Sequence, residues 1–175
     1  LDIPMYFIIR DYKYINMTKY TFRDFFENKS LKNIGFEPMI EDWVNHLSTL
    51  FPQVRLKQFL EIRSMDACSW NLICSQPAFW IGILYNENSF NKAQEIVEGW
   101  TQEDRNYINK AAPINGLQTK FKEITILEIA QKLFEISKEG LDNRNILSRN
   151  KKYNETFYLT DLEKNLSREE SPADI

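Results

Sequence analysis

The chain has 175 residues, 43% of them hydrophobic and 27% charged, which is enough for one domain with a sizeable core. The formal net charge of −3 argues against nucleic acid as the main partner, because no basic stripe survives the balancing acids. No apolar run approaches the roughly 20 residues that a membrane span needs, and the N-terminus does not have a signal-peptide pattern. The two cysteines, Cys68 and Cys74, make neither a disulfide framework nor a metal site, so we expect the protein to be located in a reducing cytoplasm.

The first third of the chain predicts a hairpin followed by a short helix. Aromatic and β-branched residues on both sides of a short polar break predict a hairpin over residues 3–17. A short helix is expected over residues 21–26, with Thr18 or Thr21 as its N-cap. Glycine and proline then predict a loop over residues 28–38. The chain begins inside an expected strand, so we expect a piece of a longer protein.

A second helix is predicted over residues 39–51. Its apolar residues recur at three- and four-residue spacing and predict one buried stripe: Ile40, Trp43, Val44, Leu47, Leu50 and Phe51. His46 lies at the flank of this stripe, where a hydrogen-bonded packing residue is a better interpretation than a catalyst. The helix runs through Pro52 directly into the next element.

That element, residues 51–66, is the stretch around which the chain is organised. With a period of two it predicts a single strand with two different faces. The apolar face is expected in the core: Val54, Leu56, Leu60 and Ile62. The other face places three cations around one carboxylate: Arg55, Lys57, Arg63 and Glu61. Such a face suits a magnesium-bound phosphate, although composition alone favours a solvated sheet face with cross-strand ion pairs.

Helical patterns fill the remainder of the chain. Pro77 is expected to kink or restart a buried helix, Ser89 and Thr101 are candidate N-caps, and Pro113 with Gly116 should end a helix. The predicted helices cover residues 70–85, 89–99, 101–112, 125–147 and 157–166. Strands followed by helices predict an α+β fold, with helices on one side of a largely antiparallel sheet whose other strands lie partly outside this chain.

Four segments together carry a resemblance to a known family. They are IPMYF near the start, then DWVNHLSTLFPQVRLKQFLEIRSMD, then W-x-x-x-C-x-x-PAFW-x-G-x-LY, and GWT. In register over residues 3–147 they resemble the C-terminal half of glutamate–cysteine ligase, in the form shared by plants and α-proteobacteria. The final SPADI is similar to the family's TPAE. The resemblance implies that residues 1–175 are the C-terminal part of a single catalytic domain, with a glutamine-synthetase-like funnel of antiparallel strands and helices outside it.

The resemblance also implies a reaction and roles for the charged face. The family joins the γ-carboxylate of glutamate to the amino group of cysteine through γ-glutamyl phosphate, with ATP and Mg²⁺, in the first step of glutathione synthesis. Its E-x-R motif matches Glu61 and Arg63, which implies a magnesium ligand and a phosphate contact. Arg55 and Lys57 lie on the same face and are further candidates for catalytic contacts.

Other family positions carry less definite implications. Tyr6, within PMYF, and Trp70 are candidates for lining the glutamate or cysteine pocket, with packing roles equally open. The family's Gly-Ala-Asp-Gly-Gly-Pro-Trp corresponds to residues 64–70, where three glycines are missing, so this loop has less backbone freedom. Cys74 matches a cysteine of a regulatory disulfide in plant members, but its partner would lie outside this chain. We therefore expect Cys68 and Cys74 to be free thiols.

Two alternative functions remain open from the sequence. One is another carboxylate–amine ligase of the same fold, and the other is a non-catalytic helical interaction module. The alternating charged strand argues against the module, because a scaffold does not need three cations around one acid. On either ligase interpretation the isolated piece is expected to be inactive and prone to associate, and a homodimer of the enzyme is left open.

Overall fold

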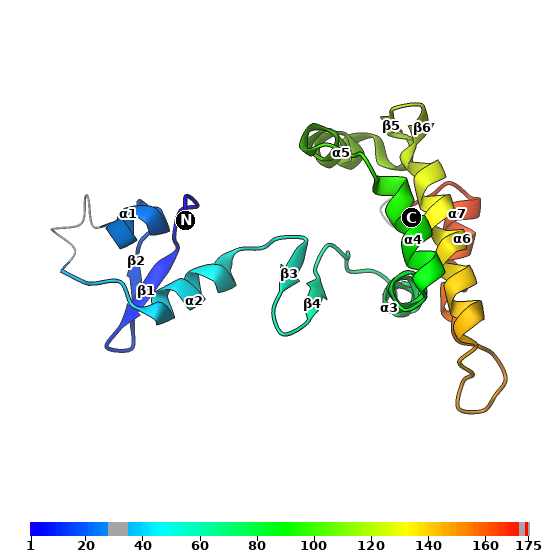
Figure 1. Cartoon of the computed structure of the whole chain (residues 1–175), viewed down its shortest axis with the longest axis horizontal. Coiled ribbons are helices and arrows are strands. Elements are labelled where there is room, and N and C mark those ends of the chain that lie inside the picture. The colour runs from blue at the N-terminus through cyan, green and yellow to red at the C-terminus, as the bar shows by residue number, and fades with distance from the viewer. Residues whose placement is uncertain (28–34, 172–173, 175) are drawn as a thin grey trace. The chain divides into compact units, whose positions relative to one another are not determined.

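The computed structural model describes residues 1–27, 35–171 and 174, and the chain divides into two compact units, Leu1–Met65 and Asp66–Ile175 (Figure 1). Within the described residues there are seven α-helices and three two-stranded antiparallel sheets. This mixed content confirms helices combined with antiparallel strands, but the described residues contain three separate hairpins, not one larger sheet. No helix among them is long and apolar enough to cross a membrane.

The first unit opens with the predicted hairpin. Strand β1 (Phe7–Arg10) pairs with β2 (Lys13–Asn16), and Arg10 lies opposite Lys13 across a two-residue turn. The turn residues Asp11 and Tyr12 have φ values of 50° and 60°. Two successive positive φ values characterise the type I′ turn, whose twist matches that of the flanking strands. The hairpin is confirmed, and the turn forms without the glycine that such turns prefer.

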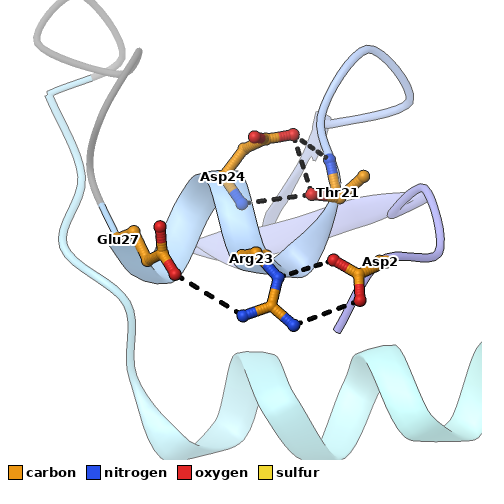
Figure 2. A network of polar contacts seen from close by, with 5 residues as sticks. All are labelled: Asp2, Thr21, Arg23, Asp24 and Glu27. Atoms are coloured by element: carbon orange, nitrogen blue, oxygen red, sulfur yellow. Dashed lines mark hydrogen bonds and ion pairs between the residues drawn. The ribbon is translucent and has the colours of Figure 1, made fainter.

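Helix α1 (Phe22–Glu27) begins with a capping box, which Figure 2 shows. The hydroxyl of Thr21 accepts a hydrogen bond from the backbone N–H of Asp24 at 3.1 Å, and the Asp24 carboxylate accepts one from the Thr21 N–H at 2.9 Å. Arg23 adds a two-pronged contact to Asp2, with its Nε 2.6 Å from Oδ1. The reciprocal bonds satisfy donors that a helix N-terminus leaves free.

Two expectations near α1 have different outcomes. Thr18 does not cap the helix, because its hydroxyl donates instead to the side chain of Asn16 at 2.8 Å. The loop predicted over residues 28–38 lies largely outside the described residues. Its described part, together with Met39, is neither helix nor strand.

Helix α2 (Ile40–Thr49) is confirmed, but its buried face differs from the prediction. Ile40 and Val44 of the expected stripe are 69% and 59% exposed, whereas Asp42 is 1% exposed. Asp42 is buried because Arg10 donates hydrogen bonds to both of its carboxylate oxygens, at 2.7 and 2.8 Å. This ion pair connects α2 to β1. A polar side chain with a full ion-pair partner can thus occupy the inner face that periodicity assigns to apolar residues.

His46 is the second buried polar residue of α2. Its ring stacks on Phe22 with centroids 5.2 Å apart, beside Trp43 and next to a core of buried apolar side chains. That core consists of Met5, Ile8, Met17, Phe22 and Phe25. The packing role is confirmed, but neither ring nitrogen has a hydrogen-bond partner among the described residues. Burial lowers the pKa of His46 from its ordinary value of 6.5, which favours the neutral ring.

The single strand predicted over residues 51–66 is wrong: the segment folds back on itself. Strand β3 (Val54–Leu56) pairs with β4 (Leu60–Ile62), with Arg55 opposite Glu61. One long strand would leave its backbone groups without partners in this chain, whereas a hairpin pairs them internally. The expected burial is wrong as well, because Leu56 and Leu60 are 79% and 65% exposed.

The second unit is a helical assembly around α6 (Ile126–Arg144). Figure 1 shows α6 beside α4 and α7, and α3, which is seen end-on, also packs against α6. The buried core lies between α3, α6 and the segment before α7, and contains Ala78, Phe134, Leu141 and Leu159. The remaining elements are α3 (Trp70–Leu84), α4 (Glu87–Val97), α5 (Gln102–Asn115), α7 (Thr160–Ser167), β5 (Lys120–Phe121), β6 (Ile124–Thr125) and the 3₁₀ helices Gly116–Gln118 and Glu155–Leu159.

The helices of this unit confirm most predicted positions and correct several boundaries. Thr101 caps α5 as predicted, but α3 and α5 continue through Pro77 and Pro113, and α5 ends at Asn115 with Gly116 as its C-cap. Asn86 caps α4 in place of Ser89, whose hydroxyl donates across to the carbonyl of Ile136 on α6 at 3.1 Å.

Helix α3 is also less buried than its composition predicts. Only one face is covered by its neighbours, because Trp70 at its start is 75% exposed and Ile73 is 40% exposed. The residues that pack inward are mostly small: Ser75, Ala78, Gly82 and Ile83. Small side chains let α6 approach closely, and Phe79 and Ile81 of α3 pack against the buried core beside them.

Candidate functional site

The β3–β4 hairpin gathers three of the four predicted charged residues into an ion triad, which we define as Arg55, Glu61 and Arg63. Arg55 donates from Nε to Glu61 Oε2 at 2.8 Å, and its Nη2 lies at the same distance from that oxygen. Arg63 reaches the other oxygen, Oε1, at 3.3 Å. The antiparallel register places Arg55 directly opposite Glu61, and Arg63 follows β4 on the same face. Folding the segment in two therefore preserves the predicted separation of its faces.

Further contacts restrict both arginines of the ion triad. The guanidinium of Arg63 lies over the ring of Phe51, 5.4 Å from its centroid. Arg55 donates a longer hydrogen bond to the carbonyl of Ser48 at 3.4 Å. The side chains of Arg55 and Arg63 are 18% and 25% exposed, so both remain reachable from solvent. The arrangement fixes two guanidinium groups in a geometry that suits binding of a phosphate or carboxylate.

The electrostatics of the triad keep Glu61 ionised. The hydrogen bond from Arg55 lowers the pKa of Glu61 below its ordinary value of 4.5, and the charge of Arg63 acts in the same direction. Both carboxylate oxygens are engaged by arginines, so this chain holds Glu61 as a fully charged and oriented acceptor. A hard divalent cation prefers an ionised carboxylate oxygen of this kind.

Lys57 is the predicted cation that does not join the triad. It lies in the turn between β3 and β4, where its backbone N–H donates to the carbonyl of Phe59 at 2.9 Å. No ion pair of its side chain occurs among the described residues. The alternation rule fails here because the chain reverses at Lys57, and a reversed chain no longer follows the period of a strand.

The two predicted substrate contacts lie in different units. Tyr6, in the first unit, is 53% exposed, and its carbonyl accepts the N–H of Met17 at 3.0 Å. Trp70, in the second unit, is the first residue of α3 and lines a cavity of about 400 Å³ together with Phe157 and Tyr158. Both side chains are exposed rather than packed in a core, and their contact with substrate stays a prediction.

Sequence reasoning missed the cavities of the second unit. The 400 Å³ cavity is bounded by α3 and α7, and a neighbouring one of about 370 Å³ includes Lys164 and Arg168. The four-residue spacing of these cations, which places both on one helix face, is the signal that could have indicated the second cavity. Cys74 lines the first cavity and Cys68 the second, and both are free thiols as expected.

The described residues do not by themselves complete a metal centre. Among residues 1–27, 35–171 and 174, no group of three or more histidine, cysteine, aspartate or glutamate side chains is arranged to hold a metal ion. Glu61 is the single carboxylate of the ion triad. Its chemistry fits one oxygen ligand of Mg²⁺, and further ligands would have to come from residues outside this part of the chain.

Comparison with known proteins defines the family. The model of glutamate–cysteine ligase family 2 matches residues 1–175, and the chain belongs to this family. It is 38% identical over 174 residues to glutamate–cysteine ligase A, chloroplastic, of Oryza sativa subsp. indica, covering 99% of this chain and 34% of the relative. It is 38% identical over 174 residues to the chloroplastic enzyme of Solanum lycopersicum, covering 99% of this chain and 32% of that protein. With the chloroplastic enzyme of Medicago truncatula, identity is 42% over 144 residues, 82% of this chain and 28% of the relative.

Two consequences follow from these relatives. The chain spans about a third of the length of the curated relatives it matches, as expected for a piece of a longer protein. The expected cytoplasmic location is contradicted, because these relatives are named as chloroplastic proteins. The cysteine content that suggested a reducing cytoplasm does not distinguish it from other reducing compartments.

Proposed function

We propose that this chain is the C-terminal part of an ATP-dependent ligase that joins the γ-carboxylate of glutamate to the amino group of cysteine. The family match over all 175 residues carries the proposal. The product is γ-glutamylcysteine, the first intermediate of glutathione synthesis, and γ-glutamyl phosphate is the activated form of glutamate. The names of the relatives support a plastid location for the complete enzyme.

The ion triad is the part of this chain that we assign to the phosphoryl-transfer site. Arg63 and Arg55 donate to oxygens of the transferring phosphoryl group, whose negative charge must be stabilised as it moves from ATP to glutamate. Glu61 holds both guanidinium groups in position before substrate arrives, since it already contacts each of them at 2.8 and 3.3 Å. Such preorganisation lowers the cost of orienting the arginines during the reaction.

Glu61 is also the residue that we assign to metal binding. In the complete enzyme one of its oxygens would hold Mg²⁺, which supplies charge neutralisation between the nucleotide and the glutamate carboxylate. Oε1 is the oxygen that would more readily exchange its arginine contact for the metal ion, because its contact with Arg63 is the weaker one, at 3.3 Å. The remaining ligands and most nucleotide contacts are assigned to the part of the enzyme that precedes this chain.

We further propose that the β3–β4 hairpin belongs to a glutamine-synthetase-like sheet in the complete enzyme. Its apolar face is exposed in this chain, with Leu56 and Leu60 as its most exposed members. Its outer strand edges also have unpaired backbone groups. Additional strands and a covering layer from the preceding sequence would satisfy both. Lys57, Tyr6 and Trp70 remain proposed contacts of phosphate or substrate.

The test is a ligation assay on the polypeptide that includes the preceding two thirds. We expect ADP release that depends on both glutamate and cysteine, with γ-glutamylcysteine identified by mass spectrometry. The 175-residue chain alone should give no such release. If another amine replaces cysteine with higher kcat/KM, the enzyme is a different carboxylate–amine ligase, and activity of the short chain alone would overturn the division of roles.

A further inference from the structure

Helix α2 carries an apolar surface that the described residues leave exposed. A cavity of about 410 Å³ lies between α1 and the N-terminal end of α2, and every side chain that lines it is apolar. The lining consists of Leu1, Phe22, Phe26, Pro38, Met39, Ile40 and Trp43. Val44 and Leu47 continue this surface along the helix. We call these nine residues the α2 groove, and none of them belongs to the ion triad.

The exposed part of the groove follows the spacing of a helix face. Ile40, Val44 and Leu47 are four and three residues apart, so their side chains lie on one side of α2, and all three are exposed. Phe26 of α1 is exposed as well and extends the same surface. Single exposed apolar residues are ordinary, but a contiguous apolar stripe beside an apolar cavity is typical of a surface that another segment covers.

The first unit cannot turn this stripe inward, because another face of α2 is already fixed. Asp42 is paired with Arg10 of β1, and the buried ring of His46 stacks on Phe22. Rotation of α2 about its axis would break both contacts. Trp43 lies between the two faces and packs on Phe22 with ring centroids 4.7 Å apart. Apolar and buried side chains thus occupy more of the helix circumference than α1 and one hairpin cover, as in a helix that is enclosed on more than one side.

The length of the relatives indicates what covers the groove. The chain spans about a third of their length, so the complete enzyme proposed above has about twice as much sequence again outside this chain. A stable interface between separate proteins uses roughly 20–30 residues on each side, whereas the groove has nine. A segment of the same polypeptide needs less contact, because the covalent link gives it a high effective concentration. The small size of the groove therefore favours such a segment over a second copy.

We propose that the α2 groove is an interface within the complete enzyme, covered by the apolar face of an amphipathic helix from outside residues 1–175. A helix suits the groove because side chains at four- and three-residue spacing form the ridges against which another helix packs. Large apolar side chains of that helix enter the cavity between α1 and α2. The proposal rests on the proposed function for the existence of the complete enzyme, and it does not depend on the identity of the substrates.

The test compares single cysteine variants of the complete enzyme. Val44→Cys lies in the groove, and Glu41→Cys is the matched control, because Glu41 is exposed on the same helix but outside the groove. Each thiol is alkylated in native and in urea-denatured protein, and mass spectrometry quantifies the modified peptide. The native rate, divided by the denatured rate, should be about tenfold or more lower for Val44→Cys, because labelling there requires local opening. In the 175-residue chain the two ratios should agree.

A photoreactive benzophenone amino acid at position 44 identifies the occupant. A mixture of isotope-labelled and unlabelled enzyme separates crosslinks within one polypeptide from crosslinks between two copies. We expect crosslinks within one polypeptide, to a peptide outside residues 1–175 with apolar residues at helical spacing. Crosslinks between copies, or to residues 66–175, overturn the proposal, because a dimer or the second unit then covers the groove.

Two labelling results also overturn the proposal: equal ratios for Val44→Cys and Glu41→Cys in the complete enzyme, or protection of Val44→Cys already in the 175-residue chain. The ligation assay is performed on the parent of the same preparations. Protection without ligation overturns the proposed function and leaves the interface in place. Ligation without protection overturns the interface and leaves the proposed function in place.

Discussion

Gly82 of α3 and Gly140 of α6 bring the two helix backbones into direct contact: a Cβ atom on Gly140 would lie 1.9 Å from the carbonyl oxygen of Gly82. A Cβ on Gly82 would lie 2.2 Å from the carbonyl oxygen of Ser137. The hydroxyl of Ser137 donates to the carbonyl of Phe79 at 2.8 Å, so polar bonds also cross between the helices. Glycine is required at this crossing by packing, since neither residue has a positive φ.

Gly140→Ala should therefore destabilise the second unit. Alanine is favoured over glycine within a helix by about 1 kcal/mol, but overpacking typically costs about 1–3 kcal/mol, and backbone atoms cannot rotate away. We expect a net loss on the order of 1–2 kcal/mol, measured by urea unfolding followed by circular dichroism. Combining it with Gly82→Ala should cost less than the sum, because the first change already separates the helices. Unchanged or increased stability would contradict the close crossing.

The buried pair Arg10–Asp42 gives a second stability prediction. Asp42→Asn removes the charge but keeps the shape, leaving Arg10, 14% exposed, without its counter-charge. Removing one partner of a buried ion pair typically costs about 3–5 kcal/mol. We expect a loss of that order in the unfolding free energy of the first unit, followed by the fluorescence of Trp43, the tryptophan of that unit.

Asp2→Asn is the matched control for this prediction. Asp2 also makes a two-pronged contact, to Arg23, but its side chain is 74% exposed (Figure 2). Exposed ion pairs contribute little because water screens both charges. The control should leave the unfolding midpoint nearly unchanged. Equal effects of the two substitutions would show that burial does not set the importance of the Arg10–Asp42 pair.

The sequence predicted elements well where local rules decide them. Turn chemistry, capping and periodicity act within a few residues. They therefore made it possible to predict the hairpin over residues 3–17, the N-cap Thr101 and the helices. The failures depend on distant partners. Asp42 is buried because Arg10, 32 residues away, pairs with it. Ser89 is not a cap because its hydroxyl reaches α6.

The candidate site was predictable in part for a similar reason. Alternation placed Arg55, Glu61 and Arg63 on one face, and a hairpin preserves that arrangement because directly paired residues share a face. Alternation did not show where the chain reverses between β3 and β4. Because the chain reverses at Lys57, this residue does not join the triad. Nothing in the alternation distinguishes one long strand from two short ones when the turn lacks glycine, asparagine and proline.

A third prediction concerns the exposed apolar face of the β3–β4 hairpin. Leu56 and Leu60 lie opposite each other on this face and are both largely exposed. Exposed apolar surface next to open strand edges favours association. The 175-residue chain should be oligomeric in sedimentation velocity experiments. Leu56→Glu with Leu60→Lys should shift it toward monomer, whereas Tyr12→Lys, at an isolated exposed turn, should not. A parent chain that is monomeric at all concentrations would contradict this prediction.

A fourth prediction follows from the pKa of Glu61, which Arg55 lowers below 4.5. A lowered pKa in the folded state means that the ionised carboxylate stabilises the fold above its ordinary pKa. This stabilisation is lost as the pH falls through the lowered value. In carbon-detected NMR titration, the Glu61 carboxyl should therefore have a midpoint below 4.5. Arg55→Gln should raise that midpoint, and Arg149→Gln should not. A midpoint at or above the ordinary value in the parent chain would exclude the triad in solution.

The last prediction tests the proposed roles of Glu61 and Arg63 in the complete enzyme. Glu61→Gln keeps the side-chain shape but removes the charge that Mg²⁺ prefers and that orients two arginines. Turnover should fall on the order of 100-fold or more, as for loss of one electrostatic transition-state contact. The Mg²⁺ concentration for half-maximal rate should rise. Arg63→Lys should lower turnover with little change in that concentration, because it keeps the charge but loses the planar fork.

Glu163→Gln is the control, since Glu163 also pairs with a cation, Lys138 at 2.7 Å, but lies on α7 in the second unit. It should leave both turnover and the Mg²⁺ requirement unchanged. If the triad is only a surface ion-pair cluster, Glu61→Gln and Arg63→Lys should resemble this control, because exposed pairs contribute little to the fold and nothing to the reaction. Rate measured against Mg²⁺ concentration for the three variants separates the cases. Curves for Glu61→Gln and Arg63→Lys within a few-fold of the parent would remove both residues from the site.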